Sequence, residues 1–352
     1  MKPTLFIIER PTPQRAPVLN ALHRRGLSLE VIYLHGDPAE QGWGSLHIDH
    51  PHSFAHSHNG LRAHTVASRI LRGDYAVLVS MGYRGSIRIA ALTAARAVRL
   101  PIAMRFDTNQ LQIESGPGPK RAGRRLLMRT TIPRSSVAWS IGQQNRRFWQ
   151  TEIGLHSIVD IPYEVPLLPG NLDAFTFTRK RESNPETLRF LYVGRLAPIK
   201  RINDAIQAFH ATPHPRWTFH IVGSGPDDGR LRNLASGDHR ISFMGSKSYR
   251  ELGAEFEQSD VLVLPSQGEP WGLVVNEALG YGLRVIASDQ VGAAHDLLSV
   301  DTGQIYPVGD VAALTSAMEA SVNHLHQSSR HPTTDTAALM EHEIKRMAGV
   351  IR

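Results

Sequence analysis

Short apolar runs alternate with amphipathic stretches along the first half of the chain. Apolar runs at 4–8, 31–34, 75–80, 101–106 and 158–161 have the length of buried strands. Between them, Val18, Leu19 and Leu22 form one stripe of a helix that we expect to stop at Gly26, and an Ala-rich segment at 87–98 predicts a second helix. Strands that alternate with helices at this spacing indicate a parallel sheet.

The second half repeats the alternation more regularly. It predicts strands at 190–193, 217–222, 241–244, 261–264 and 284–287, and helices at 202–209, 231–234, 249–256 and 273–279. A Pro- and Gly-containing polar stretch separates the halves. We therefore expect an α/β protein with two doubly wound parallel-sheet domains facing a cleft. The expected boundaries are 1–166 for the first domain, 167–187 for a linker, 188–332 for the second domain and 333–352 for a C-terminal helix. Packing of this helix against the first domain is one option.

Composition agrees with two globular domains. The 352 residues exceed what one core usually supports, and 41% hydrophobic with 20% charged residues excludes a disordered or fibrous chain. No apolar run reaches the roughly 18–20 residues needed to span a bilayer, and the first residues lack a signal-peptide core. With no cysteine, thiolate metal sites and disulfides are excluded. A cytoplasmic enzyme is the expectation.

Charge is unevenly distributed between the halves. Residues 1–166 carry 21 Lys and Arg against 11 Asp and Glu, whereas the remainder is mildly acidic within a chain of net charge +7. A basic half suggests an anionic partner, such as a nucleic acid, an acidic membrane surface or a phosphorylated substrate. Against nucleic acid, the sequence contains no helix-turn-helix, RNA-recognition or zinc-finger pattern.

Two loops that follow predicted strands carry the candidate chemistry. After 190–193 come Gly194, Arg195 and Lys200, and two cations at a strand end can clamp a phosphate. Solvated surface cations are the alternative. After 261–264 come Glu269 and, within a helix, Glu277. Glu277 has apolar neighbours, so its carboxylate should have a partner or ligand.

The start of that second helix also predicts an anion site. Pro270 fits a helix entrance and Gly272 allows close backbone approach. The amides of Gly272, Leu273 and Val274 would then meet an anion at the positive end of the helix dipole.

The segments 192–200 and 269–277, YVGRLAPIK and EPWGLVVNE, resemble the signature of glycosyltransferase family 4. Its pattern is two Glu separated by seven residues, with an Arg and a Lys upstream. Further matches at 223–226, 243–245 and 287–292 extend the resemblance over about residues 188–300, and 10–15 with 104–108 resemble the family more loosely. The resemblance implies a nucleotide-sugar-dependent, retaining enzyme of the GT-B fold.

The resemblance also implies residue roles. Arg195 and Lys200 would hold the donor diphosphate and neutralise charge as the nucleotide leaves. Glu269 would hold hydroxyls of the donor sugar and Glu277 those of the ribose. No side chain need act as nucleophile, and neither a metal nor another cofactor is expected. The donor-binding set is Gly194, Gly223, Gly225, Ser246, Lys247, Gly272, Leu273, Val274, Glu277 and Arg15.

The first half departs from the family pattern at two places. Where many members have a Gly-Gly loop, this chain has 11–15, in which Arg15 would contact the phosphate or lie exposed. Where many have a His-Asp pair, this chain has Arg105-Phe106-Asp107. Asp107 is then the candidate to orient the acceptor, with a helix cap or turn as its alternative.

Two further patterns are weaker. Six His between 47 and 64 lack the spacing of a compact zinc site and predict a polar loop near the cleft. A basic stretch at 120–129, with Arg134 beyond it, reads as a helix that would lie on an anionic membrane surface or expose a solvated Arg face.

The expected function is transfer of a sugar from a nucleotide-sugar donor to a saccharide or lipid-linked acceptor, in surface polysaccharide synthesis. A nucleotide-sugar epimerase or phosphorylase on the same fold is the alternative enzyme, because fold does not fix function. A basic nucleic-acid-binding protein is the alternative from another class.

Overall fold

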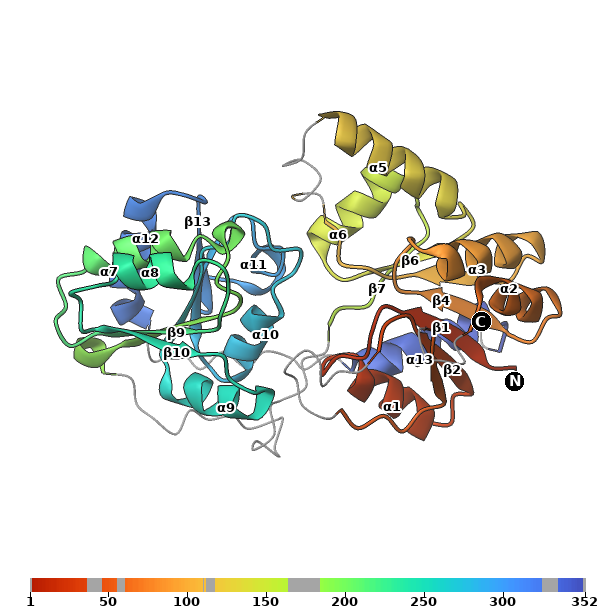
Figure 1. Ribbon diagram of the computed structural model, residues 1–352, viewed down its shortest axis with the longest axis horizontal. Coiled ribbons are helices and arrows are strands. Elements are labelled where there is room, and N and C mark those ends of the chain that lie inside the picture. Colours follow the sequence, from red (N-terminus) through yellow and green to blue (C-terminus); the bar gives the residue numbers. More distant parts are fainter. Residues whose placement is uncertain are drawn as a thin grey trace. The chain divides into compact units, whose positions relative to one another are not determined.

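The computed structural model describes residues 2–36, 46–55, 61–109, 111, 118–163, 184–324 and 335–350. The chain divides into two compact units (Figure 1). Unit 1 comprises Met1–Pro166 and Thr334–Arg352, and unit 2 comprises Leu167–Thr333. The expected linker lies largely outside the described residues, which resume at 184 with the short η3 (Pro185–Thr187).

Unit 1 is built on a parallel sheet of seven strands in the order β3-β2-β1-β4-β5-β6-β7. The strands are β1 (Thr4–Ile8), β2 (Leu29–Tyr33), β3 (His52–Phe54), β4 (Val77–Ser80), β5 (Ile102–Met104), β6 (Val137–Ser140) and β7 (Ile158–Asp160). Thr4 of β1 lies opposite Leu29 of β2 on one side and Val77 of β4 on the other. Strand order therefore reverses direction between β1 and β4.

Helices cover both faces of this sheet. They are α1 (Ala16–Arg24), α2 (Ala63–Leu71), α3 (Ser86–Ala97), α5 (Gly118–Thr131), α6 (Gln143–Phe148), η2 (Trp149–Ile153) and α13 (Thr336–Met347). Leu5 and Ile7 of β1 face the core beneath α2, α3 and α5, whereas Phe6 and Ile8 face the core beneath α1 and α13. Successive side chains of a strand point to opposite faces, so a strand buried on both faces needs a continuous apolar run.

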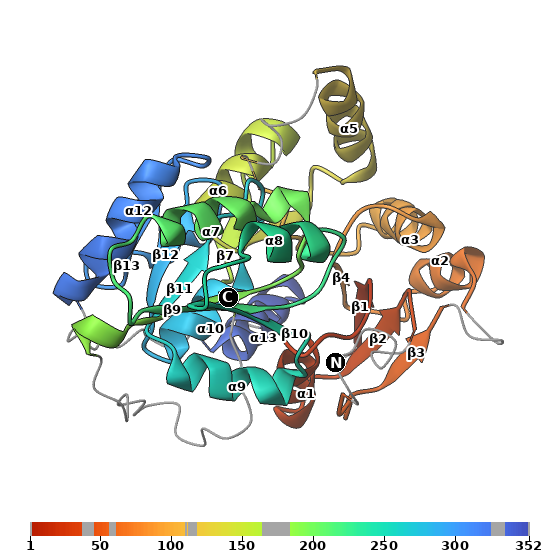
Figure 2. The same ribbon diagram turned by 60° about the vertical axis from the view of Figure 1, so that its left-hand side comes forward.

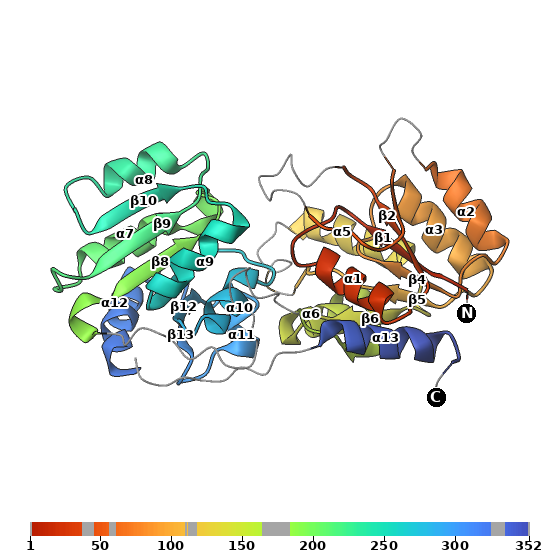
Figure 3. The same cartoon turned by 90° about the horizontal axis from the view of Figure 1, so that it is seen from below.

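The helix α13 belongs to unit 1 although all of unit 2 separates it from the rest of that unit in the sequence. The helix lies beside α1 (Figure 3). Ala337, Met340 and Ile344 are buried in the same core as Val18 and Leu19 of α1. Arg25 pairs with Asp335, the N-cap residue of α13, with 2.5 Å between Nη2 and Oδ2.

Unit 2 contains a parallel six-stranded sheet in the order β10-β9-β8-β11-β12-β13. The strands are β8 (Arg189–Val193), β9 (Thr218–Val222), β10 (Ile241–Gly245), β11 (Val261–Leu264), β12 (Arg284–Ser288) and β13 (Gly303–Tyr306). Its helices are η4 (Pro198–Lys200), α7 (Ile202–His210), α8 (Asp228–Leu234), α9 (Tyr249–Gln258), α10 (Leu273–Gly280), α11 (Ala294–Leu297), α12 (Val311–Ala320) and η5 (Ser321–His324).

In unit 2, α7, α8 and α12 cover one face of the sheet, and α9 and α10 the other (Figure 2). The strand order is that of a doubly wound nucleotide-binding sheet, with its switch point between β8 and β11. The prediction of two doubly wound parallel-sheet domains is confirmed. The predictions missed three strands, β3, β6 and β13, and several helices, among them α2 and α12.

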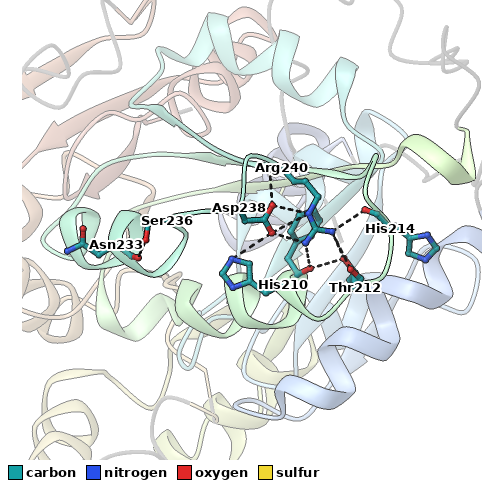
Figure 4. A network of polar contacts seen from close by, with 8 residues as sticks. His210, Thr212, His214, Asn233, Ser236, Asp238 and Arg240 are labelled. Carbon is teal, nitrogen blue, oxygen red and sulfur yellow. Dashed lines mark hydrogen bonds and ion pairs between the residues drawn. The ribbon is translucent and has the colours of Figure 1, made fainter.

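A polar network fastens the amino-terminal side of the unit 2 sheet (Figure 4). Arg240, just before β10, donates to both Asp238 carboxylate oxygens. It also donates to the carbonyl of Phe209 at the end of α7 and to those of Thr212 and His214 after this helix. The guanidinium also lies 4.8 Å from the Phe209 ring centroid. Ligands of such sheets bind at the opposite, carboxyl-terminal edge, so this network is structural.

Candidate functional site

The two loops that carry the expected signature meet at the switch point of unit 2. Gln267 donates its amide to the Ile199 carbonyl at 2.8 Å, which joins the loop after β11 to the loop after β8. Across this junction the Lys200 ammonium forms an ion pair with the Glu269 carboxylate, and both side chains are more than four-fifths buried. The sequence placed both residues at the site but did not predict that they pair with each other.

Close backbone packing explains the glycines of the site. A Cβ on Gly223 would lie 1.9 Å from the Gly194 carbonyl oxygen, and one on Gly225 would lie 2.1 Å from the Leu196 carbonyl oxygen. The Gly194 amide donates to Val222, and the Leu196 amide donates to Ser224. These glycines therefore allow the loops after β8 and β9 to touch, whatever ligand they also contact.

The loop that leads into α10 is fixed on both sides. Glu269 donates its amide to Gln290, and Gly292 donates back to Glu269. Gly272 is the N-cap of α10 with φ of 95°, and no side chain caps this end. The first amides of a helix have no partner within it, so those of Leu273 and Val274 are available to an anion, and their contact with the donor stays a prediction.

Glu277 lies one helical turn further along α10 and is 8% exposed. Burial is the main cause that raises the pKa of Tyr281 to about 12, and the charges of Glu257 and then Glu277 add to the rise. A nearly buried carboxylate on the helix that begins at the anion position agrees with a ligand-facing role, and its role toward ribose stays a prediction.

Arg195 and Tyr192 complete the loop after β8. The Tyr192 hydroxyl donates to the Arg195 carbonyl at 3.0 Å, and burial chiefly raises the Tyr192 pKa, with Glu269 adding to the rise. The Arg195 side chain is exposed and has no ion-pair partner among the described residues. Sequence reasoning missed Tyr192, although an aromatic residue next to the end of a ligand-facing strand is a usable signal.

Two expected donor-binding residues on the loop after β10 have other partners in the structure. Ser246 donates its hydroxyl to Ser224 at 2.8 Å, which links this loop to the loop after β9. Lys247 forms an ion pair with Glu255 of α9 at 2.7 Å. His220 hydrogen-bonds the same carboxylate at 3.3 Å. Lys247 is therefore held toward α9.

In unit 1, Arg15 and Asp107 line one cavity of about 210 Å³. It lies where β1 and β5 end, and α13 contributes Thr336 and Met340 to its wall. Its lining includes the apolar Val18 and Leu19, and its other polar lining residues include Glu9, Gln14 and Tyr163. The structure thus brings the two expected residues of the first half together, and sequence reasoning missed the part played by α13.

Arg105 supports this cavity from below. Its guanidinium is buried, donates to the carbonyls of Ile161 and Pro162, and lies 5.1 Å from the Tyr163 ring centroid. Burial is the main cause that lowers its pKa to about 10, and the nearby Arg15 charge adds to the lowering. Burial likewise raises the pKa of Tyr163, which hydrogen-bonds Arg15. Arg105 is a structural cation that fixes the backbone around the cavity.

The weaker sequence patterns are also placed. His50 is buried and bonds Tyr33 and Asn20 at 2.9 and 2.7 Å, whereas His56 and His58 lie outside the described residues. Among the residues that the structure describes, no group of three His, Asp or Glu could hold a metal ion.

The basic helix α5 exposes Leu126 and Leu127, and two of its arginines contact Glu152 within unit 1. Arg125 pairs with Glu152 at 2.6 Å, and Arg129 donates to the Glu152 carbonyl. Within the described part of the chain, no helix is long and apolar enough to cross a bilayer.

Comparison with known proteins agrees with the loops of unit 2. Residues 173–330 match the family model described as Glycosyl transferases group 1. The chain is 32% identical over 166 residues to a glycogen synthase of Mycobacterium tuberculosis, covering 45% of this chain and 39% of that protein. It is 37% identical over 131 residues to an exopolysaccharide phosphotransferase of Streptomyces coelicolor, covering 35% of this chain and 14% of that protein. The matches to these first relatives thus span less than half of each relative's length.

A longer match joins the chain to a GDP-mannose-dependent alpha-mannosyltransferase of Mycobacterium tuberculosis. The identity is 28% over 347 residues, covering 89% of this chain and 84% of that protein. Among solved structures, a glycosyltransferase from Rickettsia africae matches with a TM-score of 0.70 and 14% identity, covering 99% and 93% of the two chains. Anabaena HepE in complex with UDP and glucose matches with a TM-score of 0.66 and 16% identity, covering 98% and 95%. The chain has the GT-B fold, and its sequence over 173–330 is similar to the glycosyl transferases group 1 family.

Proposed function

We propose that this protein is a retaining glycosyltransferase that moves a hexose from a nucleotide-sugar donor to a saccharide or lipid-linked acceptor in surface polysaccharide synthesis. The observation that carries the proposal is the junction of Lys200, Glu269 and the uncapped start of α10 at the switch point of unit 2. Cations and helix amides at one point suit a diphosphate, and a carboxylate beside them suits sugar hydroxyls.

In this proposal the Lys200–Glu269 pair is the resting state of the donor site. When the donor binds, its diphosphate replaces the Glu269 carboxylate as the partner of Lys200, and Glu269 accepts hydrogen bonds from the sugar. Arg195 is free of ion pairs among the described residues and supplies a second cation as negative charge develops on the leaving phosphate. The acceptor hydroxyl attacks on the face that the leaving phosphate vacates and gives its proton to that phosphate oxygen.

Unit 1 supplies the acceptor site. The cavity of Arg15 and Asp107 is lined by both apolar and polar residues, which suits a sugar ring. Asp107 is exposed there and would orient an acceptor hydroxyl. The exposed Leu126 and Leu127 of α5 support contact with an anionic membrane surface on the cytoplasmic side, where a lipid-linked acceptor would lie.

The test is a thermal-shift screen of the full chain against nucleotides and nucleotide sugars, followed by product analysis with and without saccharide acceptors. One nucleotide sugar should stabilise the protein, by about 2.7 kcal/mol at 100 times its dissociation constant. Arg195→Ala and Lys200→Ala should each lower turnover at least about tenfold with the fold retained. Conversion of the donor without any acceptor would instead identify an epimerase.

Because Arg195, Lys200 and the α10 amides already supply positive charge, we propose that no metal is required. Activity should then persist in the presence of a chelator. Complete loss that added metal reverses would overturn this part of the proposal.

A further inference from the structure

Unit 1 contains a second cavity, of about 520 Å³, that the roles assigned above do not use. It lies past the carboxyl ends of β1, β2, β4 and β5, where the strand order reverses direction. Its polar lining residues are Glu9, His35, Arg84, Ser86, Arg88 and Thr108. Its volume falls within the range of roughly 300–1,000 Å³ that is usual for small-molecule sites.

The start of α3 forms one wall of this cavity. This twelve-residue helix begins after Gly85, which has φ of 93°, carries no side-chain cap and has no acidic residue in its first turn. A Cβ on Gly85 would meet nothing within 4 Å, so the space in front of the helix end is open. The first amides of α3 therefore present the positive end of the helix dipole to the cavity.

Arg88, in the first turn of α3, adds a buried positive charge to the same wall of the cavity. It lines the cavity and is 4% exposed, and its Nη1 donates to Glu9 Oε2 at 2.7 Å and to the Arg84 carbonyl at 3.3 Å. Its Nε and Nη2 are buried and have no hydrogen-bond partner in the described part of the chain. Arg88 therefore places a buried guanidinium charge beside the cavity, and this charge favours an anion there.

The charges around the cavity leave an excess of positive charge. Glu9 lies between Arg88 and His35, whose Nε2 is 3.0 Å from Glu9 Oε1. Burial raises the pKa of Glu9, but the hydrogen bond and charge of Arg88, with His35 and Arg10, outweigh burial and lower it. Glu9 is thus a carboxylate that balances Arg88. Arg84 is exposed at the rim, has no ion-pair partner among the described residues and adds its charge to that of the helix end.

We propose that this cavity binds a phosphate or diphosphate group through the amides at the start of α3 and Arg84, with the buried charge of Arg88 beside them. The cavity shares Glu9, Met81 and Phe106 with the cavity of Arg15 and Asp107, so one ligand can extend through both. Resting on the proposed function, the acceptor is therefore a saccharide whose phosphate or lipid diphosphate lies at α3 while its sugar lies beside Asp107.

The binding test uses phenyl phosphate and calorimetric titration of the full chain carrying Arg195→Gln, which weakens the competing phosphate position in unit 2. In this background Arg84→Gln should raise the dissociation constant about fivefold or more. Arg96→Gln is the matched control, because Arg96 is exposed near the far end of the same helix and the charge change is the same. Equal affinities of the Arg84→Gln and Arg96→Gln chains, or no binding before either change, would overturn the proposal.

Ser86→Asp separates an effect on phosphate binding from an effect on the stability of α3. A carboxylate in the first turn stabilises a helix through its dipole, whereas in the cavity it repels an anion. The melting temperature should therefore stay level or rise while phenyl phosphate binds about tenfold more weakly. A variant that melts normally and binds phenyl phosphate normally would contradict the proposed site.

Two further arms identify the source of the phosphate and separate this proposal from the proposed function. If Arg84→Gln weakens binding to phosphatidylcholine vesicles that contain phosphatidic acid, the phosphate belongs to a lipid headgroup. If Arg84→Gln weakens only the binding of phenyl phosphate, the phosphate belongs to a soluble phosphorylated saccharide. In turnover assays, Arg84→Gln should raise KM for phosphorylated acceptors and leave their dephosphorylated forms unaffected. Phosphate binding that depends on Arg84 in a chain without transferase activity would refute the proposed function and keep this site.

Discussion

Lys200 and Glu269 are separated by 69 positions in the sequence and pair across two loops. Each side chain is mostly buried, so removing either charge leaves the other without its partner. In Glu269→Gln, Lys200 becomes available to a diphosphate without competition. Because only Glu269 pairs with Lys200, we expect substitution of Glu269 and of Glu277 to have different effects on ligand binding.

We expect Glu269→Gln to bind the bare nucleoside diphosphate at least as tightly as the unmodified protein, and to weaken the full donor or lower kcat. Glu277→Gln should weaken the diphosphate and the donor alike, raising KM with little change in kcat, because the ribose does not react. Calorimetric titration of both variants measures this, with Glu319→Gln on the exposed side of α12 as a charge-matched control. Normal diphosphate binding by Glu277→Gln alongside its loss in Glu269→Gln would reverse the two roles.

Among the elements, the loops after β8 and β9 depend on the absence of side chains. A methyl group on Gly223 would lie 1.9 Å from the Gly194 carbonyl oxygen, and φ of 142° is itself unfavourable for alanine. Gly223→Ala should therefore lower the free energy of unfolding by more than about 1 kcal/mol and weaken nucleotide binding by displacing Arg195.

Gly229→Ala is the control for this prediction. It lies in α8, where a Cβ meets nothing within 4 Å, so alanine should be neutral or stabilising by up to about 1 kcal/mol. Urea denaturation and nucleotide titration measure both effects. Equal free energies of unfolding for Gly223→Ala and Gly229→Ala would show that the loops after β8 and β9 can move apart without loss of stability.

The Arg240 network predicts a pH dependence of stability at the other edge of the same sheet. The hydrogen bond from Arg240 is the main cause that lowers the pKa of Asp238 below its ordinary value of 3.8. A carboxylate with a lowered pKa stabilises the fold above its unfolded pKa, and this contribution is lost as pH falls through the folded pKa. Between about pH 5 and about pH 2.5, the unmodified protein should therefore lose more stability than Asp238→Asn. Parallel losses in the two proteins would argue against a role for this pair.

The pattern of apolar residues predicted the central strands well and the outer ones poorly. Runs at 4–8 and 261–264 coincide with β1 and β11, because a strand buried on both faces is apolar throughout. The edge strands β3 and β13 are half exposed and contain His52, Ser53 and Gln304, so no continuous run marks them. The glutamates and cations were found from their positions after strands. The pairing of Lys200 with Glu269 was not predicted, because the residues within each loop do not reveal which strands are neighbours in the sheet.

At the scale of the whole molecule, unit 1 is made from two separate segments. Ile344 of α13 is fully buried in the core that α1 shares, whereas Leu339 on the same helix is 40% exposed. Ile344→Ala should cost about 2–5 kcal/mol in unfolding free energy, and Leu339→Ala should cost well under half of that. Chemical denaturation followed by tryptophan fluorescence measures both, and an equal small effect would show that α13 contributes little to unit 1.

The return of α13 to unit 1 also has a consequence during translation. As the chain leaves the ribosome, residues 1–163 emerge first, yet the apolar face of α1 and its strands stays uncovered until residues 336–347 follow. Unit 2 has its whole sheet in one continuous segment and can close beforehand. Domains usually fold in the order of synthesis, at about 5–20 residues per second, whereas here the later unit is complete before the earlier one. A nascent chain stalled before residue 336 should therefore present Val18, Leu19 and Leu22 to chaperones, and release from them should coincide with the emergence of α13.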